Sequence, residues 1–262
     1  MIPRAEVRVS LVGAGPGDPE LLTLGALRRL RLADVVLHDA LVTPEILALC
    51  SPGARRIDVG KRGGREGASQ EWITALLVSE ARAGRRVVRL KGGDPYLFGR
   101  GGEEALALTR AGIPWEVVPG VSSALGVPAR AGIPITHRGV SSSVAIVTGH
   151  LAVGAEAIDW AGLAGAQTLV VLMGAEHVAE ICSALLASGR LPDTPVAIVQ
   201  RGTLPDQQTV VSTLAALART GSMERLARPA LLVIGEVVKL AVELDAWRDT
   251  LLTEEGVNAR PA

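Results

Sequence analysis

Two glycine-rich segments stand where an α/β protein usually places a ligand-binding turn. The first, LVGAGPGD, covers residues 11–18, and the second, LKGGDPYLFGRGGEE, covers residues 90–104. Each directly follows an apolar run with β-strand character, and the turn after such a strand is a common place for a nucleotide. Glycine lets a backbone approach a ligand closely but does not select the ligand. The neighbouring residues must therefore decide the chemistry.

The first segment does not meet the requirements of a phosphate site. The dinucleotide motif G-x-G-x-x-G needs a third glycine where this chain has Asp18, whose carboxylate would repel a pyrophosphate. Pro16 also removes one amide that a phosphate cradle would use. Neither segment continues into the G-K-[ST] of a Walker A loop. Both suit a cationic ligand without phosphate, such as S-adenosylmethionine, although each could also be a tight turn in which Asp18 or Asp94 caps a helix.

Apolar strand-like runs alternate with helical runs in the first half of the chain. Strands are expected at 7–12, 34–39, 55–60, 86–91 and 115–120, with helices near 20–33, 44–50, 69–83 and 101–112. This repeated β-α-β pattern predicts a doubly wound, mostly parallel sheet.

The second half predicts a different sheet. Strands are expected at 142–150, 168–174, 195–202, 207–214 and 229–238, with helices near 176–188, 212–220 and 240–251. Because only TLPD separates two of these strands, we expect a hairpin and a mixed sheet. The predicted domains are an N-terminal α/β domain at 1–120, a proline- and glycine-rich connection with one short helix at 121–139, a C-terminal α/β domain at 140–250 and a flexible tail at 251–262.

Composition argues against several classes of protein. The 262 residues carry 27 basic and 27 acidic side chains, so no net charge attracts nucleic acid or an anionic membrane. No signal peptide and no apolar run of membrane-spanning length is found. Cys50 and Cys182 lack the spacing of metal ligands, and no histidine supplies a partner. We expect a cytoplasmic protein with no metal site, in which 24 of the basic residues are arginines.

Several segments together resemble the tetrapyrrole methylases, and within them the C-methyltransferases that act on uroporphyrinogen III. The similarity runs from about Val7 to about Leu240 and is most specific in RVVRLKGGDPYLFGRGGEE and in VPGVSSALGVPARAGIPITHRG. It implies the two-domain class III methyltransferase fold, with an active-site cleft between the domains, and a homodimer. It also implies that S-adenosyl-L-methionine is the cofactor and S-adenosyl-L-homocysteine the product.

The resemblance implies the reaction and its residues as well. The expected reaction methylates uroporphyrinogen III at positions 2 and 7, giving precorrin-2 through precorrin-1 for sirohaem or cobalamin. The implied cofactor contacts are Pro16, Gly92, Gly93, Asp94, Leu97, Ser122, Ser123, Met173 and Gly202. Asp39 is the implied proton acceptor and Lys61 the implied donor. From the residues alone, Asp39 could instead cap the helix near Pro44 or bind a ligand hydroxyl, and Lys61 could pair with a substrate carboxylate.

The substrate's eight carboxylates suit the arginines that lie in glycine- or proline-rich loops. Our candidates for substrate binding are Arg62, Arg65, Arg100, Arg130 and Arg138. One departure from the family lies beside Asp39, where HDALV replaces the common YDRLV. Two alternatives remain open: another precorrin methyltransferase of the cobalamin pathway, or a protein that binds tetrapyrrole or S-adenosylmethionine without turnover.

Overall fold

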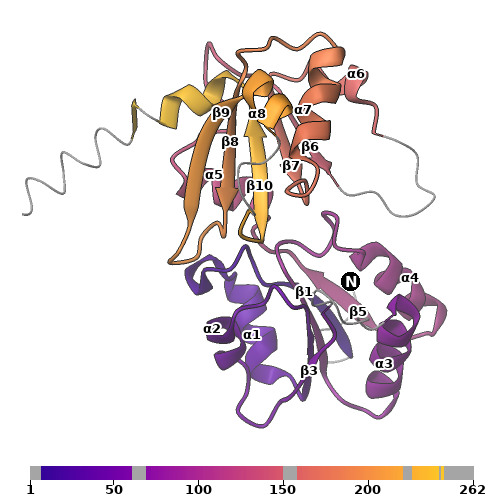
Figure 1. Cartoon of the computed structure of the whole chain (residues 1–262). Coiled ribbons are helices and arrows are strands. Elements are labelled where there is room, and N and C mark those ends of the chain that lie inside the picture. The colour runs from indigo at the N-terminus through magenta and orange to yellow at the C-terminus, as the bar shows by residue number, and fades with distance from the viewer. Residues whose placement is uncertain (1–6, 61–68, 150–157, 221–225, 242, 245–262) are drawn as a thin grey trace, which may run out of the picture. The chain divides into compact units, whose positions relative to one another are not determined.

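The computed structural model describes residues 7–60, 69–149, 158–220, 226–241 and 243–244. The chain divides into two compact units, Met1–Gly126 and Val127–Ala262 (Figure 1). Each unit contains one five-stranded sheet with helices. The prediction of two α/β units is therefore confirmed, while the exact domain boundaries and the cleft expected between the domains stay predictions.

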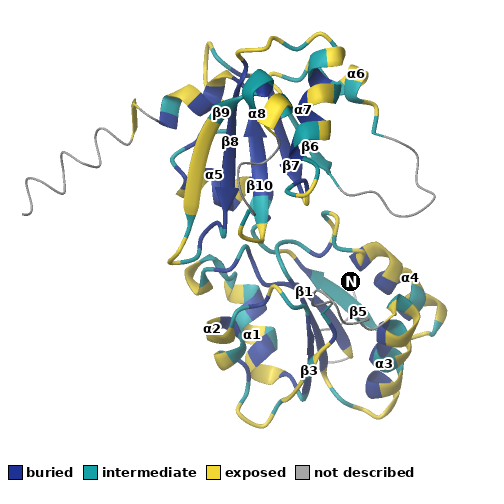
Figure 2. Cartoon of the chain, viewed as in Figure 1, coloured by how far each residue is buried: buried dark blue, intermediate teal, exposed yellow. Residues whose placement is uncertain are grey.

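The first unit is an entirely parallel sheet in the order β3-β2-β4-β1-β5. Its strands are β1 (Val9–Gly13), β2 (Val35–His38), β3 (Arg55–Asp58), β4 (Val87–Lys91) and β5 (Trp115–Val118). Its helices are η1 (Pro19–Leu21), α1 (Leu24–Leu32), α2 (Pro44–Ala48), α3 (Gln70–Arg82) and α4 (Gly101–Arg110), followed by α5 (Ser123–Arg130). The central strands β1, β2 and β4 are buried along their whole length (Figure 2).

Alternation along each strand divides the core of the first unit into two layers. Val88 and Leu90 of β4 pack with α1 and α2 on one face, where Leu30 and Ile46 are fully buried. Val87 faces the other side, where α3 and α4 cover the sheet. The next two positions of β4 on that second face are Arg89 and Lys91, whose charged side chains are buried.

The second unit is a mixed sheet in the order β6-β7-β10-β8-β9. Its strands are β6 (Val144–Thr148), β7 (Thr168–Leu172), β8 (Pro195–Gln200), β9 (Gln208–Thr213) and β10 (Ala230–Ile234). Its helices are α6 (Trp160–Leu163), α7 (Val178–Ala187), α8 (Leu214–Thr220) and η2 (Glu236–Lys239). Strands β8 and β9 pair antiparallel, which confirms the hairpin, and β6 and β7 pair parallel.

Three details differ from the sequence prediction. The strand expected at 229–238 ends at Ile234, because Gly235 has a φ of 143° and the chain turns into η2. The helix expected at 20–33 is divided into η1 and α1, and the Thr23 side chain caps α1 by accepting from the amide of Ala26. The short helix α6 was not predicted. Most of the helix expected at 240–251, and the tail at 251–262, lie outside the described residues.

Candidate functional site

All five strands of the first sheet end at one edge, so the loops that follow them meet there. The two glycine segments lie side by side because β1 and β4 are neighbours. Gly15 and Gly93 form an antiparallel bridge in which the Gly93 amide donates to Gly15 O at 2.7 Å and the Gly15 amide donates to Gly93 O at 3.2 Å. The edge is thus lined by two loops that hold each other in place.

Three amides of these loops donate hydrogen bonds within the protein. Besides the Gly15 and Gly93 amides, Ala14 donates its amide to Lys91 O at 2.8 Å. Pro16 has no amide to offer. A phosphate cradle needs several free amides converging on one point. The geometry therefore supports the sequence argument that these glycine loops do not hold a phosphate.

Asp94 links its own loop to the loop that follows β5. Its Oδ2 accepts from the Gly120 amide at 3.1 Å, and its Oδ1 accepts from the Tyr96 amide at 2.8 Å. It does not cap a helix, whereas Asp18 is the N-cap of η1 and accepts from the Glu20 amide at 2.9 Å. The two aspartates of the glycine segments therefore have different structural roles.

The other cofactor candidates of the first unit gather around these loops. A Cβ built on Gly93 would lie 3.8 Å from Ser123 N and 3.9 Å from Ser122 Cα, and one on Gly126 would lie 3.2 Å from Pro16 Cγ. Leu97 is half-buried in the second loop, between the exposed rings of Tyr96 and Phe98. The structure thus brings Pro16, Gly92, Gly93, Asp94, Leu97, Ser122 and Ser123 to the loops of one sheet edge.

Asp39 follows β2 at the same edge. Its Oδ1 accepts from Nη2 of Arg89, and its backbone amide donates to Leu90 O at 3.2 Å. The Asp39 side chain is 30% exposed, whereas that of Arg89 is 3% exposed. The helix α2 has Thr43 at its N-cap position. The carboxylate of Asp39 therefore pairs with a buried arginine instead of capping that helix.

Arg89 continues into a buried charge network. Its Nε donates to Oε1 of Glu104 at 3.0 Å, and Nζ of Lys91 donates to the same oxygen at 3.2 Å. Burial acts to lower the pKa of Arg89, but the negative charges of Asp39 and Glu104 raise it above its usual value. Burial and the charge of Arg89 lower the pKa of Lys91, against the attraction of Glu104.

Sequence reasoning missed this network. Its signal was present in β4, where Arg89 and Lys91 occupy alternate positions of a strand expected to be buried. A charge on such a strand needs a buried partner. That partner is Glu104, which lies in the first turn of α4. Its contact with β4 depends on how α4 packs on the sheet, which the sequence pattern does not specify.

The loops of the second unit hold two further candidates. Strands β7 and β8 both run antiparallel to β10, so their carboxyl ends lie at one edge of that sheet. Met173 follows β7 and Gly202 follows β8. Met173 has a φ of 56° and its side chain is 50% exposed, while a Cβ on Gly202 would collide with Val127.

Left-handed backbone at non-glycine residues is concentrated near these candidates. In the described part of the chain it occurs at Phe98, Arg100, Met173, Arg201 and Thr203. Such conformations cost of the order of 1 kcal/mol or more and cluster at functional sites. All five residues belong to loops that follow β4, β7 or β8.

Three of the five candidate substrate arginines belong to the described residues. Lys61, Arg62 and Arg65 lie outside the described residues. Arg130 ends α5 and Arg138 lies in the turn closed by the bridge between His137 and Ser141, and both are exposed.

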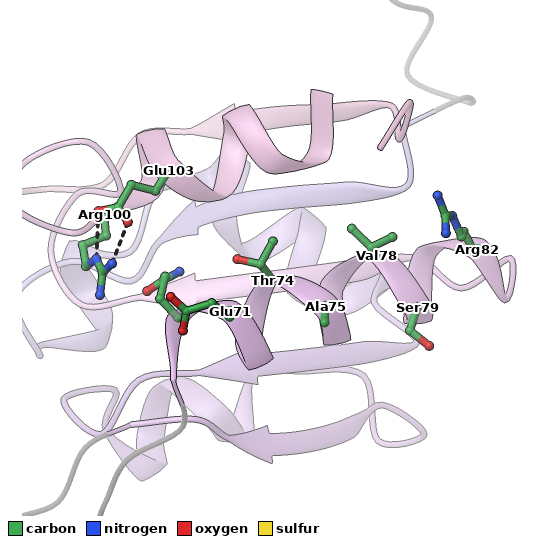
Figure 3. A pocket seen from close by; sticks show the side chains of 9 residues that line it. Glu71, Thr74, Ala75, Val78, Ser79, Arg82, Arg100 and Glu103 are labelled. Carbon is green, nitrogen blue, oxygen red and sulfur yellow. Dashed lines mark hydrogen bonds and ion pairs between the residues drawn. The ribbon is translucent and has the colours of Figure 1, made fainter. Parts of the chain in front are cut away.

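Arg100 borders an open groove between α3 and α4 of about 740 Å³ (Figure 3). Its guanidinium pairs with Glu103, with Nη2 2.6 Å from Oε2. The groove extends along α3 from Gln70 to Arg82, the last residue of that helix. Of the second glycine-rich segment only Arg100 and Glu103 line the groove, and Pro16, Gly92, Gly93 and Asp94 do not, so the groove is not the candidate cofactor site.

The described residues show neither a cluster of three or more histidine, cysteine or acidic side chains able to hold a metal nor a helix long and apolar enough to cross a membrane.

The fold is that of a two-domain α/β protein, and its glycine-lined sheet edge is the candidate ligand site. The chain belongs to the Tetrapyrrole (Corrin/Porphyrin) Methylases, whose family model matches residues 8–218. The class III fold expected from the sequence is thereby confirmed.

Several known proteins are similar to most of this chain. A siroheme synthase of Azotobacter vinelandii is 53% identical over 246 residues, which are 94% of this chain and 53% of that protein. The chain thus spans about half the length of the curated relatives it matches.

Two solved structures are similar over nearly their whole length. Uroporphyrin-III C-methyl transferase from Thermus thermophilus, complexed with S-adenyl homocysteine, is 48% identical with a TM-score of 0.79, and the match covers 89% of this chain and 99% of that one. A cobalt precorrin-4 methyltransferase is 28% identical with a TM-score of 0.76, covering 90% and 98%.

Proposed function

We propose that this protein is an S-adenosyl-L-methionine-dependent C-methyltransferase that methylates uroporphyrinogen III at positions 2 and 7, giving precorrin-2 through precorrin-1. The observation that carries the proposal is the 48% identity with the Thermus thermophilus enzyme over 99% of its length, in a complex with S-adenyl homocysteine. The product would serve sirohaem or cobalamin biosynthesis, in agreement with the similarity to siroheme synthases.

The cofactor is proposed to bind at the edge formed by the two glycine loops. Pro16, Gly92, Gly93, Asp94, Leu97, Ser122 and Ser123 would contact it, together with Met173 and Gly202. Support comes from the close packing of the loops around Gly93, and from the hydrogen bonds in which the Gly15 and Gly93 amides donate to each other's carbonyl oxygens. Such a surface suits a sulfonium cofactor that has no phosphate.

The chain's residues would act mainly by alignment. In the proposed reaction an electron-rich pyrrole carbon would form a bond to the sulfonium methyl as the bond between that methyl and sulfur breaks, leaving S-adenosylhomocysteine with a neutral thioether sulfur. Holding the two reacting atoms about 3–3.5 Å apart lowers the barrier by several kcal/mol. The methylated macrocycle then loses a proton, and we propose Asp39 as the acceptor. Arg89 holds Oδ1 of Asp39, and no described residue hydrogen-bonds to Oδ2.

Lys61 is proposed as a proton donor, and the five arginines Arg62, Arg65, Arg100, Arg130 and Arg138 as partners of the substrate's carboxylates. Arginine suits this role because its planar fork binds a carboxylate with two hydrogen bonds. For Arg100, a substrate carboxylate would have to take the place of Glu103, which now occupies that fork.

A test of the proposal uses the purified chain, S-adenosylmethionine and uroporphyrinogen III prepared without oxygen. We expect the mass of the tetrapyrrole to increase by that of two methyl groups, and the product to have the absorbance spectrum of precorrin-2. A parallel reaction with a methylated precorrin tests the alternative of a later cobalamin methylase, which the lower identity of 28% disfavours. Turnover of the precorrin alone would overturn the substrate assignment. Binding of S-adenosylhomocysteine without any methyl transfer would favour a protein that binds without turnover.

We also propose that the protein is a cytoplasmic homodimer. Strand β9 is an edge strand that is exposed along most of its length (Figure 2). Its Val210 is 40% and its Val211 50% exposed. Exposed apolar residues on an edge strand favour association. The buried free thiols of Cys50 and Cys182 agree with a reducing compartment. Sedimentation equilibrium would test the dimer, and a monomer at all concentrations would refute it.

A further inference from the structure

One oxygen of Glu104 receives all the hydrogen bonds that this side chain makes with described residues. Gln70 Nε2, Arg89 Nε and Lys91 Nζ donate to Oε1 at 3.1, 3.0 and 3.2 Å. Oε2 is buried and has no partner among the described residues. Glu104 is fully buried, on the face of the sheet that α3 and α4 cover.

Arg89 connects this buried carboxylate with Asp39 at the sheet edge. Its Nε bonds to Glu104, its Nη1 donates to Leu90 O at 3.2 Å, and its Nη2 bonds to Asp39. Three sides of the guanidinium are thus held at once. Because the planar guanidinium of Arg89 is fixed by Glu104 and Leu90 O, the Asp39 carboxylate that pairs with it has little freedom to rotate.

The network is balanced in charge and costly to bury. Asp39 and Glu104 carry two negative charges, and Arg89 and Lys91 two positive ones. Taking such charges out of water costs several kcal/mol each, and apolar residues of similar size often stabilise a core equally well. The surrounding core contains Leu11, Leu37 and Leu108, which are all fully buried. Stability therefore does not by itself require a charged network here.

We propose that Glu104 is a positioning residue for Asp39 and acts through Arg89: it fixes the guanidinium so that Oδ1 of Asp39 is held and Oδ2 faces the reacting proton. Lys91 balances the second negative charge of the network. The inference rests on the proposed function, because it assigns a role to Asp39 in methyl transfer. It concerns residues that do not touch the substrate.

A double-mutant cycle tests the inference. Glu104→Gln removes the charge while keeping a similar shape, and Asp39→Asn removes the acceptor. We expect Glu104→Gln to lower kcat by about 100-fold, with the KM for S-adenosylmethionine unchanged, because misplacing a reacting group by about 1 Å has an effect of that size. In the Asp39→Asn background the same substitution should have little further effect. Glu104→Asp, which restores the charge, should recover part of kcat.

The matched control is Glu80→Gln. Glu80 is also a buried glutamate of this face, paired with Arg55 and Arg85, and within the described part of the chain neither it nor these arginines pair with Asp39. We expect Glu80→Gln to lower the unfolding midpoint while leaving kcat unchanged. Equal losses of kcat in the two variants, or independent effects of Glu104→Gln and Asp39→Asn, would overturn the inference. If Glu104→Gln does not fold, Arg89→Lys takes its place in the cycle.

A separate measurement does not depend on turnover. Protein labelled with ¹³C at the aspartate carboxyl carbon gives an Asp39 signal that Asp39→Asn identifies by its loss. We expect Glu104→Gln to move this signal and Glu80→Gln to leave it in place. An unmoved signal would refute the link from Glu104 to Asp39. If the wild-type protein methylates no tetrapyrrole but the signal moves, the proposed function fails while the structural link remains.

Discussion

The backbone of Gly13 lies directly against that of Gly120. A Cβ built on Gly13 would lie 2.5 Å from the amide nitrogen of Gly120, and one built on Gly120 would lie 2.7 Å from Gly13 Cα. Real Cβ atoms do not approach backbone so closely, so neither position accepts a side chain without a shift of the loops. This contact joins the ends of β1 and β5 beside the loop that follows β4.

Gly120→Ala should therefore disturb both stability and cofactor binding. A methyl group there would collide with Gly93 O as well as with Gly13. We expect a loss of about 1–3 kcal/mol in the free energy of unfolding, typical of overpacking, and weaker binding of S-adenosylhomocysteine by calorimetry. The control is Gly53→Ala, where a Cβ meets nothing within 4 Å. A Gly120→Ala variant as stable as the control would contradict the packing described.

Two adjacent glycines of α4 should respond in opposite ways to the same substitution. A Cβ on Gly101 would collide with Pro95 O, whereas one on Gly102 meets nothing within 4 Å. Because alanine favours a helix over glycine, Gly102→Ala should stabilise the protein by about 0.5–1 kcal/mol. Gly101→Ala should destabilise it. Urea denaturation of the two variants checks the difference in sign, and equal effects would refute it.

Local patterns were sufficient to predict most of the fold. Continuous apolar runs such as those at β1 and β4 marked buried parallel strands, and the four residues TLPD marked the hairpin of β8 and β9. The prediction failed where only a few residues distinguish a helix or a turn from the neighbouring structure. The four-residue helix α6 is too short for a periodic pattern, and the turn at Gly235 interrupts an apolar run that otherwise reads as one strand.

The candidate site was less accessible to sequence reasoning. From the sequence, Asp94 in its glycine-rich turn could cap a helix or contact a ligand. The sequence does not reveal that its carboxylate accepts a hydrogen bond from the amide of Gly120, 26 positions further along the chain. The pairing of Asp39 with Arg89 spans 50 positions. Such contacts follow from the order of the strands, which alternating β-α-β patterns do not specify.

Asp94→Asn should loosen the loops around the proposed cofactor site. An asparagine has only one acceptor oxygen, so it cannot accept from both the Gly120 and Tyr96 amides as Asp94 does. We expect the free energy of unfolding to fall by about 1–3 kcal/mol, the usual cost of an unsatisfied polar group. Binding of S-adenosylhomocysteine should also weaken. Unchanged affinity and stability would show that the two hydrogen bonds do not organise the site.

Asp39→Asn distinguishes a proton acceptor from a residue that only binds the ligand. Loss of an acceptor should lower kcat by about 10²–10⁴-fold, because a positioned base contributes rate enhancement of that order. The KM for uroporphyrinogen III and the affinity for S-adenosylhomocysteine should change little. Steady-state kinetics and calorimetry provide these values. A raised KM with nearly normal kcat would instead assign Asp39 to substrate binding.

The ion pair between Asp34 and Arg86 should make stability depend on pH in the acid range. Hydrogen bonds from the side chain and backbone amide of Arg86 lower the pKa of Asp34 to about 2. The unfolded chain has a pKa of about 3.9 at this carboxyl. A lowered folded-state pKa stabilises the protein above the unfolded value, and this contribution is lost as the pH falls towards 2.

Asp34→Asn tests this dependence. Since both side chains are partly exposed, at 38% and 55%, solvent screening limits the expected loss at neutral pH to about 0.5–1 kcal/mol. Urea denaturation of wild type and variant should show a difference that is full above about pH 4 and shrinks towards pH 2. High salt should reduce the part due to charge. A difference that stays constant from neutral to acid pH would mean that the charge of Asp34 contributes nothing, and that only the shape of its side chain matters.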